Sequence, residues 1–439
     1  MLLDHLLSHL PGAQYDPVRF RIAGRREIHG VTTDSRSSAP GMLFVSLPER
    51  QRENPFQACA AHDRGCAAVV RDGATPAPRG ASCVEVDDAC SALGWIAAAL
   101  HDHPSRRLAV FGVAGESGPR ARLAGVLTEL LGAAGGCCAR FSPAECASGD
   151  RVHPWEVAGM DASHVQNELA RHARIGGTAC VVELGHDALA DSLTKGIEFR
   201  RRMEAADQLP EGMVPTRLSP RGSFCTWHRE GREYRVATPL AGRLQVAALG
   251  RALEMAADAG ISLTRLLATV PTLRVTTGWL EPVHAGQPFG LFVDAAGDAR
   301  SMESTLTCAR EMTQGRLFVV TGPRPDADSG GMLELARVCG VLADAVVVTT
   351  DDLAPGEFAR RAPDFAANAG GPRAMAVVEA DRHQALRRVC GAARPGDVVV
   401  VAGKATNPTQ RLGDVLIPWD DRAHLGSVLG RMSYVGGDF

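Results

Sequence analysis

Five short apolar runs in the last third of the chain constrain its fold most strongly. They are FGLFVDAAG (289–297), RLFVVTG (316–322), DAVVVTTD (344–351), AMAVVEAD (374–381) and GDVVVVAG (396–403). Each run is nearly continuous rather than alternating, which is typical of parallel strands that are buried on both faces. Helical patterns separate the runs, so this region is predicted to form a doubly wound, Rossmann-like α/β domain.

Similar patterns precede this region. LAVFGVAG (108–115) and TACVVELG (178–185) predict two more buried strands with helices between them, and shorter strands are predicted at 41–47 and 65–72. The whole chain is therefore expected to be of the α/β class.

The chain of 439 residues is long enough for two or three domains. A helix over 89–107 that ends near Pro104 predicts the first boundary. A β-hairpin at 219–240 and a helix at 243–260 are expected before the second boundary. The predicted domains are 1–106, 107–271 and 272–439.

The composition argues against several classes of function. The net charge of −3 gives no general electrostatic reason to bind nucleic acid or a membrane, and aromatic residues make up only 5% of the chain. No stretch approaches the roughly 20 apolar residues of a membrane span. The twelve cysteines are scattered, which favours buried free thiols in the cytoplasm over a zinc site or a disulfide framework.

The segment VFGVAGESGPRAR (110–122) has the outline of a nucleotide-binding loop, with an apolar strand, a glycine turn and a helix that begins near Pro119. A phosphate loop of the G-x-x-G-K-[ST] kind needs lysine at the place of Pro119 and a hydroxyl at the place of Arg120. Gly115 and Gly118 remain, so the segment resembles a phosphate loop that lacks the lysine and the hydroxyl group.

Several stretches in this order resemble the Mur ligases, and most closely the MurE type, which extends UDP-N-acetylmuramoyl-dipeptide. They are GVTTDSRSSAPGMLFVSL (30–47), HDHPSRRLAVFGVAGESG (101–118), VVELGHDAL (181–189) and GDVVVVAGKATNPTQ (396–410). The resemblance implies an N-terminal uridine-nucleotide domain, a central P-loop-like ATPase domain that is shortened here, and a C-terminal Rossmann-like ligase domain.

The resemblance also implies a chemistry. In the family, a substrate carboxylate attacks the γ-phosphate of ATP, and an amino acid's amine then displaces phosphate from the acyl phosphate to form an amide. The reaction needs a lysine and backbone N–H groups on the phosphates, together with Mg²⁺ and stabilisation of the transferred charge. Pro119 removes both the lysine and one N–H, and Arg120 removes the hydroxyl. Arg120 or Arg122 could supply charge only at another register.

The metal and lysine positions of the family are also altered. Glu183 matches the magnesium-binding glutamate, although a polar residue at a strand end is an equally good interpretation. The histidine that follows in the family is replaced by Asp187, with His186 one place away. Most of the segment that carries the family's carbamylated lysine is absent after Leu189, and Lys195 is interpreted as a solvated helix residue.

The last domain retains only part of the family's motifs. Asp294 remains at the first strand end, but the aromatic residue and the histidine that follow it in the family do not. The stretch 349–357 replaces the Asp-Asn-Pro-Arg motif, so the arginine that recognises the incoming amino acid is missing. Lys404 is retained without its following Gly-His-Glu, and it is interpreted as a loop cation rather than a substrate contact.

The N-terminal domain keeps its motif. Thr33, Asp34, Ser35 and Arg36 match the family's uridine-nucleotide signature, in which Ser35 contacts uracil or its ribose. An Asp–Arg pair around a turn is also useful for folding alone, so structural retention stays an alternative. The stretch 49–56 replaces the family's Asp-Gly-His.

These observations predict a MurE-like pseudoenzyme of the cytoplasm, for which no cofactor is expected. It would bind a peptidoglycan precursor such as a UDP-muramyl peptide, or would scaffold a Mur ligase or another cell-wall enzyme. The alternative is a divergent active amide ligase that uses ATP and Mg²⁺ with Arg120 or Arg122, Glu183 and Lys404. A structural partner that binds no ligand is a third hypothesis.

Overall fold

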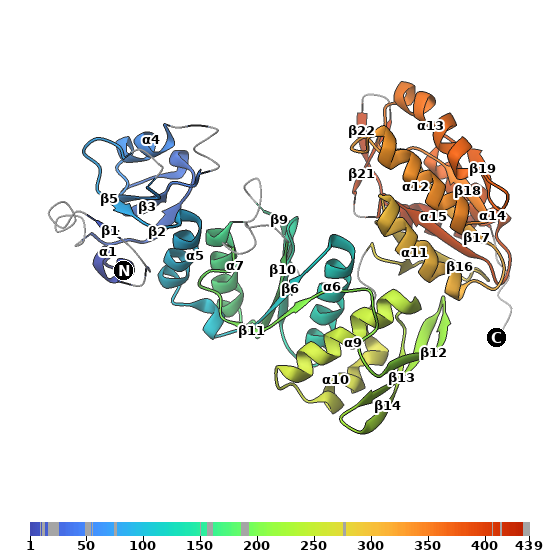
Figure 1. Cartoon of the computed structure of the whole chain (residues 1–439), viewed down its shortest axis with the longest axis horizontal. Helices are drawn as coiled ribbons and strands as arrows, with labels where there is room; N and C mark the ends of the chain where they lie inside the picture. The colour runs from blue at the N-terminus through green and yellow to red at the C-terminus, as the bar shows by residue number, and fades with distance from the viewer. Residues whose placement is uncertain are drawn as a thin grey trace. The chain divides into compact units, whose positions relative to one another are not determined.

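The computed structural model describes residues 1–8, 10, 14–15, 26–48, 54, 56–73, 77–149, 151–155, 161–185, 193–274, 278–405, 407–412 and 415–432. These residues form two compact units, Met1–Glu116 with Gly135–Glu204, and Ser117–Ala134 with Ala205–Phe439. The division runs through the loop between one strand and the helix that follows it. Figure 1 labels the elements.

The first unit begins with a small sheet in the strand order β1-β5-β4-β3-β2, in which β1 is antiparallel to its neighbour and the other pairs are parallel. The strands are β1 (Gln14–Tyr15), β2 (Gly30–Thr32), β3 (Met42–Val45), β4 (Ala68–Arg71) and β5 (Cys83–Glu85). The accompanying helices are α1 (Leu3–Leu7), η1 (Ser35–Ser37), α4 (Gln57–Asp63), α5 (Ala89–Leu100) and η2 (Pro104–Arg106).

A second sheet of this unit has the strand order β11-β6-β10-β7-β8-β9. Its four parallel strands are β6 (Ala109–Ala114), β7 (Cys138–Phe141), β10 (Ala179–Leu184) and β11 (Phe199–Glu204). Two antiparallel strands, β8 (Glu145–Ser148) and β9 (Arg151–Pro154), extend it, and α7 (Ala162–Arg174) precedes β10. The central strands β6 and β10 are those predicted from their apolar runs.

The second unit contains α6 (Ser117–Ala133), which packs against α9 (Gly242–Asp258). Three antiparallel strands form a meander, β12 (Met213–Ser219), β13 (Gly222–Arg229) and β14 (Arg232–Thr238). The hairpin and the long helix were predicted, but β12 was not, because it contains Pro215 and its register shifts beside that residue. Two short helices follow, α10 (Leu263–Thr269) and η3 (Val270–Thr272).

The C-terminal sheet has the strand order β15-β16-β20-β17-β18-β19. The strands are β15 (Glu281–Pro282), β16 (Gly290–Asp294), β17 (Leu317–Thr321), β18 (Ala345–Val348), β19 (Met375–Val378) and β20 (Val398–Ala402). The helices are α11 (Ala299–Met312), α12 (Ser329–Leu342), α13 (Pro355–Ala369), α14 (Arg382–Ala392) and α15 (Asp421–Arg431). The hairpin of β21 (Thr409–Leu412) and β22 (Val415–Pro418) lies outside this sheet.

Both faces of the C-terminal sheet are buried at β16, β17, β18 and β20, as their apolar runs predict. The edge strand β19 differs, since Met375 is 67% and Val378 is 43% exposed. Phe292 and Val400 pack with α11, α12 and α13 on one face, whereas their neighbours Val293 and Val401 pack with α14 and α15 on the other. Five strands are parallel, from β16 to β20, and the short β15 is antiparallel at the edge. The prediction of a doubly wound α/β domain is therefore confirmed.

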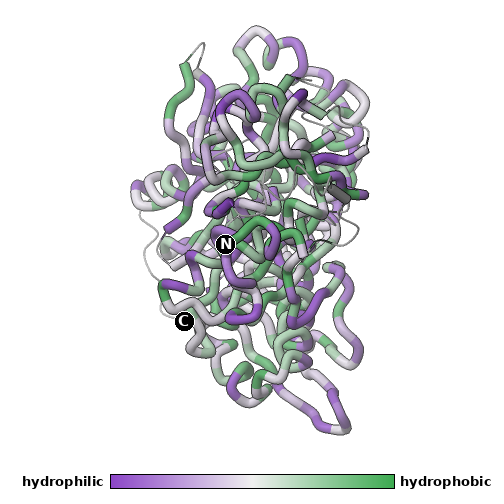
Figure 2. The backbone as a smooth tube through the Cα atoms, turned by 90° about the vertical axis from the view of Figure 1, so that its left-hand side faces the viewer, coloured by the Kyte–Doolittle hydropathy of each residue, from purple (hydrophilic) through white to green (hydrophobic). Residues whose placement is uncertain are grey.

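Hydrophobic segments are short and alternate with hydrophilic ones along the backbone (Figure 2). Among the residues that the structure describes, no helix is long and apolar enough to cross a membrane. All twelve cysteines are free thiols, and seven of them are buried.

Candidate functional site

The loop between β6 and α6 has the backbone outline of a phosphate loop. The backbone turns at Gly115, whose φ of +122° suits glycine, and α6 begins at Ser117. Pro119 lies in the first turn of α6, where a missing N–H costs the helix nothing. The helix is therefore intact, whereas Pro119 offers neither the positive charge nor the N–H that a phosphate group would require.

Arg122 does not replace the missing lysine. Its side chain is only 4% exposed and lies 2.5 Å from Asp207, and its guanidinium stacks over the ring of Trp279 at 5.3 Å. A Cβ atom added to Gly118 would lie 3.3 Å from Trp279 and 3.4 Å from Arg122. Arg122 is thus held between an acidic and an aromatic side chain, while Arg120 is half-buried in the first turn of α6. The sequence pattern gave no indication of Trp279.

Glu183 near the carboxyl end of β10 is only 2% exposed, and its carboxylate is paired with an arginine. The Nε of Arg140 donates to Oε1 of Glu183 at 2.9 Å, and a terminal nitrogen of the same guanidinium lies 2.7 Å from that oxygen. Arg140 comes from the neighbouring strand β7, opposite Val181. A magnesium ion at Glu183 would have to displace this guanidinium, because two cations repel each other strongly in a poorly solvated site.

The residues next to Glu183 that the family comparison singled out, His186, Asp187 and Leu189, lie outside the described residues. Lys195 is described and lies in a turn, so the interpretation of it as a helix residue is wrong. Its carbonyl accepts a hydrogen bond from Gln166, and its backbone lies so close to Gly94 of α5 that a Cβ there would clash. This packing places Lys195 in a tightly fixed turn.

Asp294 at the end of β16 is fully buried and accepts three hydrogen bonds. The donors are the N–H of Leu280 at 2.7 Å, the N–H of Ala296 at 2.8 Å and the hydroxyl of Thr305 at 3.1 Å. Burial raises the pKa of Asp294, and the two N–H groups oppose that shift. Its carboxylate therefore organises the strand end from within.

Lys404 is also buried, and its ammonium group is paired with acidic side chains. Its side chain is fully buried, and its ammonium group lies 2.7 Å from Asp352 and 3.6 Å from Asp351. Asp352 has a left-handed backbone, with φ +62°, and also accepts hydrogen bonds from the Asn407 side chain and the Arg411 N–H. The two acidic residues already neutralise Lys404, which fits a structural role better than a substrate contact.

A cavity of about 600 Å³ lies beside this edge of the C-terminal sheet. Its charged lining residues are Asp298, Arg300, Arg324, Asp326, Asp328 and Glu334. Arg324 is engaged with Asp326 and with the carbonyl of Gly403. The acidic groups outnumber the arginines in the lining, which disfavours a triphosphate there.

The N-terminal motif is well ordered. Asp34 caps η1 by accepting from the N–H of Arg36, and it also pairs with the Arg36 guanidinium at 2.8 Å. Thr33 is buried and donates to Asp161, the N-cap of α7, at 3.4 Å. Pro40 and Gly41 form a turn, which is closed by the hydrogen bond from the Met42 N–H to the Ala39 carbonyl.

This motif and the residues that follow it contain two buried serines. Ser35 is buried, and the hydroxyl of the buried Ser38 has no hydrogen-bond partner among the described residues. A buried polar atom without a partner is uncommon, and a ligand atom could satisfy it. Most of the stretch 49–56 lies outside the described residues.

One further cluster, Cys146, His153 and Glu168, has three ligand atoms within 4.8 Å of one another. Arg171 lies 2.6 Å from Glu168, so its guanidinium already compensates the negative charge of the carboxylate that would bind a metal ion. A free thiol rather than a zinc ligand stays the prediction for Cys146.

Taken together, the residues do not fit ATP and Mg²⁺. The loop carries proline in place of its cation, Glu183 is held by Arg140, and Lys404 is held by Asp352. The chain nevertheless keeps a glycine turn between β6 and α6 and a Rossmann-like C-terminal sheet.

Comparison with known proteins shows what this chain is similar to. The family described as "Mur ligase, glutamate ligase domain" matches residues 280–405. The chain is 26% identical to a UDP-N-acetylmuramyl-tripeptide synthetase of Roseiflexus sp. (strain RS-1), over 99% of this chain and 100% of that protein. It is 27% identical to a UDP-N-acetylmuramoyl-L-alanyl-D-glutamate–2,6-diaminopimelate ligase of Streptomyces coelicolor, over 91% of this chain and 92% of that protein.

Solved structures agree on the fold. A UDP-N-acetylmuramoyl-L-alanyl-D-glutamate–2,6-diaminopimelate ligase superposes with a TM-score of 0.68 at 19% identity, covering 99% of this chain and 100% of that chain. The MurF ligase from Thermotoga maritima in complex with ADP superposes with a TM-score of 0.52 at 12% identity, over 93% of this chain and 97% of that chain. The solved structures share the α/β fold of this chain. The C-terminal domain matches the Mur ligase family model, and the chain is similar over nearly its whole length to proteins named as MurE-type ligases.

Proposed function

We propose that this protein is a MurE-like member of the family that binds a UDP-muramyl-type precursor but does not perform ATP-dependent ligation. The observation that carries the proposal is the ion pair between Arg140 and Glu183, which occupies the carboxylate that the resemblance assigns to magnesium. Pro119 supports it independently, because the loop has no cation for a phosphate. We place the protein in the cytoplasm, with three domains at 1–106, 107–271 and 272–439.

Precursor binding is assigned to the N-terminal motif of Thr33, Asp34, Ser35 and Arg36. The Asp34–Arg36 pair keeps η1 in place, and the buried hydroxyl groups of Ser35 and Ser38 lie beside it. The unsatisfied Ser38 hydroxyl supports a ligand rather than a purely structural motif. A bound precursor would let the protein present that compound to a cell-wall enzyme, such as an active Mur ligase.

The second candidate is a divergent active amide ligase. It is favoured by the names of the relatives, which are synthetases and ligases matched over nearly the whole chain. This candidate requires ATP and Mg²⁺, with Arg120 or Arg122 at the phosphates. It also requires that Glu183 is released from its basic partner and Lys404 from its acidic partners. One difference disfavours it. The alignment with the Roseiflexus protein extends over 524 positions, so that protein has segments that this chain of 439 residues lacks.

Thermal unfolding of the purified chain with UDP-muramyl peptides, and separately with ATP–Mg²⁺, tests the proposal. A ligand that binds only the folded state raises the melting temperature by mass action. We expect a shift with the UDP-muramyl peptide, its loss in Ser35→Ala, and its retention in Ser37→Ala, which alters an exposed serine of the same helix. A saturable shift with ATP–Mg²⁺, together with phosphate release, would instead establish the active ligase.

A further inference from the structure

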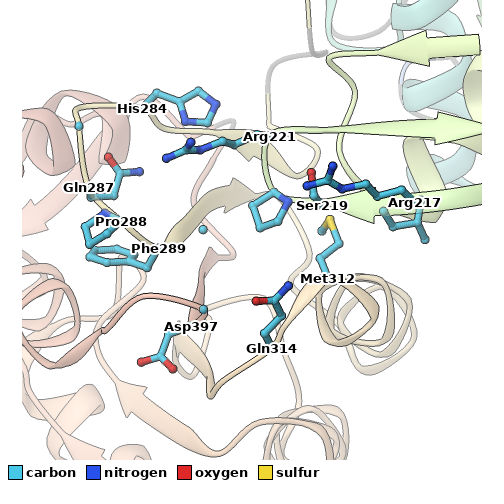
Figure 3. A pocket seen from close by; sticks show the side chains of 15 residues that line it. Arg217, Ser219, Arg221, His284, Gln287, Pro288, Phe289, Met312, Gln314 and Asp397 are labelled. Atoms are coloured by element: carbon cyan, nitrogen blue, oxygen red, sulfur yellow. The ribbon is translucent and has the colours of Figure 1, made fainter. Parts of the chain in front are cut away.

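A second cavity, of about 670 Å³, lies at the edge of the C-terminal sheet where the parallel strands begin (Figure 3). Its lining includes Gly290 at the start of β16, Gln314 before β17 and Asp397 before β20. Asp294 and Lys404 lie at the opposite, carboxyl ends of these strands. The cavity is therefore separate from the positions that resemble the family's catalytic site.

The walls of this cavity are preformed. The turn between β12 and β13 supplies one wall, and the hydroxyl of Ser219 donates to the Gly222 carbonyl at 2.8 Å within that turn. Pro220 at its tip packs on the sheet so closely that a Cβ at Gly290 would lie 2.8 Å from it. The loop of the opposite wall is braced by Gln287, which donates to the Val283 carbonyl at 2.5 Å and accepts from the Ala285 N–H.

The cavity is basic. Arg217 and Arg221 are exposed, and within the described part of the chain neither guanidinium has a hydrogen-bond or ion-pair partner. His284 lies beside Arg221 (Figure 3), and burial, followed by the charge of Arg221, lowers the pKa of His284. Arginines without a partner that line one cavity attract an anion.

Asp397 does not cancel this charge. Its two oxygens accept hydrogen bonds from the Arg316 N–H at 2.7 Å, the Arg394 N–H at 2.9 Å and the Arg316 guanidinium at 3.0 Å. The carboxylate also points away from Arg221 in Figure 3. The floor of the cavity is apolar, since Phe289 and Met312 are buried there.

We propose that this cavity binds a phosphate-bearing ligand of nucleotide size. The planar guanidinium groups of Arg217 and Arg221 suit the bidentate recognition of phosphate oxygens. The apolar floor of Phe289 and Met312 suits an organic group such as a base, and the volume is within the usual range for small-molecule sites. Because the cavity lies away from the family's reacting positions, its ligand acts as an effector or an anchor rather than as a substrate.

Calorimetric titration of the full chain tests this site with ADP, UDP, inorganic pyrophosphate and, as a non-phosphate anion, citrate. We expect saturable binding of ADP or UDP that weakens with added salt, with pyrophosphate weaker and citrate weakest. In the Arg217→Ala/Arg221→Ala double variant, the affinity is expected to fall by about tenfold or more. Both arginines are exposed, so folding should be unaffected, and unchanged melting temperature checks this.

Two matched controls complete the design. Arg232→Ala removes an exposed arginine at the other end of the same three-stranded meander, and it should leave the affinity unchanged. Ser35→Ala should leave the affinity for ADP unchanged, which separates this site from the proposed precursor site, where UDP can also bind. Absence of binding by every phosphate compound at millimolar concentration overturns the inference, and so does equal affinity in the double variant. Pyrophosphate binding as tight as that of ADP would show that the apolar floor contributes nothing, and would overturn the nucleotide-size assignment.

Discussion

Arg140 of β7 donates from its Nε to the carboxylate of Glu183 on the adjacent strand β10. The two side chains lie on the same face of the sheet, because Arg140 is opposite Val181 and Glu183 follows two residues later. The side chain of Glu183 is only 2% exposed, and a charge so poorly solvated needs a partner, which the guanidinium of Arg140 provides. The position that resembles a metal ligand has therefore become part of the interstrand packing.

The first prediction concerns this pair. Arg140→Ala leaves the Glu183 carboxylate buried without its guanidinium, and the loss of one partner of a buried pair typically costs about 3–5 kcal/mol. We expect a clearly lower melting temperature at neutral pH. Arg106→Ala is the matched control in the same compact unit, since Arg106 pairs at 2.7 Å with Glu198 but both side chains are more than half exposed. That exposed pair should contribute about 0–1 kcal/mol.

The double variant Arg140→Met/Glu183→Leu completes this test. Replacing both charges by apolar groups should recover most of the stability that Arg140→Ala loses, because no uncompensated charge remains. Equal melting temperatures of Arg140→Ala and the wild type would show that Glu183 is solvated or held by other groups. The argument that it is unavailable to a metal ion would then lose its basis.

The strands of the C-terminal sheet could be predicted because strands that are buried on both faces consist of nearly continuous apolar residues. Runs such as VVVVA (398–402) admit no polar face, so their neighbours must cover both sides. The strand β12 has no such apolar run, since Pro215 interrupts it and three of its seven residues are exposed. Its existence depends on pairing with β13, which is a tertiary interaction.

The site was predictable only where a single residue type decides the chemistry. Pro119 cannot act as a lysine in any environment, so its consequence could be derived from the loop alone. The ion pair between Glu183 and Arg140 could not be derived in this way, because the two residues are 43 positions apart in the sequence and become neighbours only through the order of the strands in the sheet. The same holds for Arg122 with Trp279, and for the contact of Thr33 with Asp161.

The second prediction concerns pH. Burial raises the pKa of Asp161, but the stronger combined effect of the His164 ring, the Ser163 side chain and the His164 N–H lowers it from an ordinary value of 3.8 to about 2. A depressed pKa means that the stabilisation is fully present above about pH 4 and is lost as the pH falls through 2. The gap in melting temperature between wild type and Asp161→Asn should therefore narrow between pH 5 and pH 2.

Asn remains a good N-cap for α7, so this substitution removes the charge with little change of shape. Parallel melting curves in a series of buffers measure the difference directly. A gap that stays constant over that range would mean that the charge of the Asp161 carboxylate, including its pairing with His164, contributes nothing to stability.

The third prediction assigns Lys404 to the interior of its domain. Lys404→Met leaves Asp351 and Asp352 close together without the ammonium group between them, so the variant should unfold at a lower temperature. Binding of a UDP-muramyl peptide to the folded variant should be unchanged, because the proposed site is in the N-terminal domain. Loss of that binding with an unaltered melting temperature would make Lys404 a ligand contact.

The last prediction is that repair of the loop does not restore ligation. Pro119→Lys with Arg120→Thr returns the cation, the N–H and the hydroxyl, so affinity for ATP–Mg²⁺ can reappear. Pro119→Ala with Arg120→Ala is the matched control, since it restores the N–H without the lysine or the hydroxyl. Catalysis, however, depends on interactions that are stronger in the transition state than in the ground state, and a loop that binds nucleotide supplies only part of them.

In the repaired chain, Glu183 would still be paired with Arg140, and Lys404 would still be paired with Asp352. The arginine that the family uses for the incoming amino acid would still be absent after Asp352, where Leu353 and Ala354 stand. We therefore expect nucleotide binding by calorimetry and no phosphate release that depends on both a UDP-muramyl peptide and an amino acid. Product formation in that assay would mean that the sequence of the loop alone prevents ligation in the wild type, and that the Arg140–Glu183 ion pair opens during the reaction.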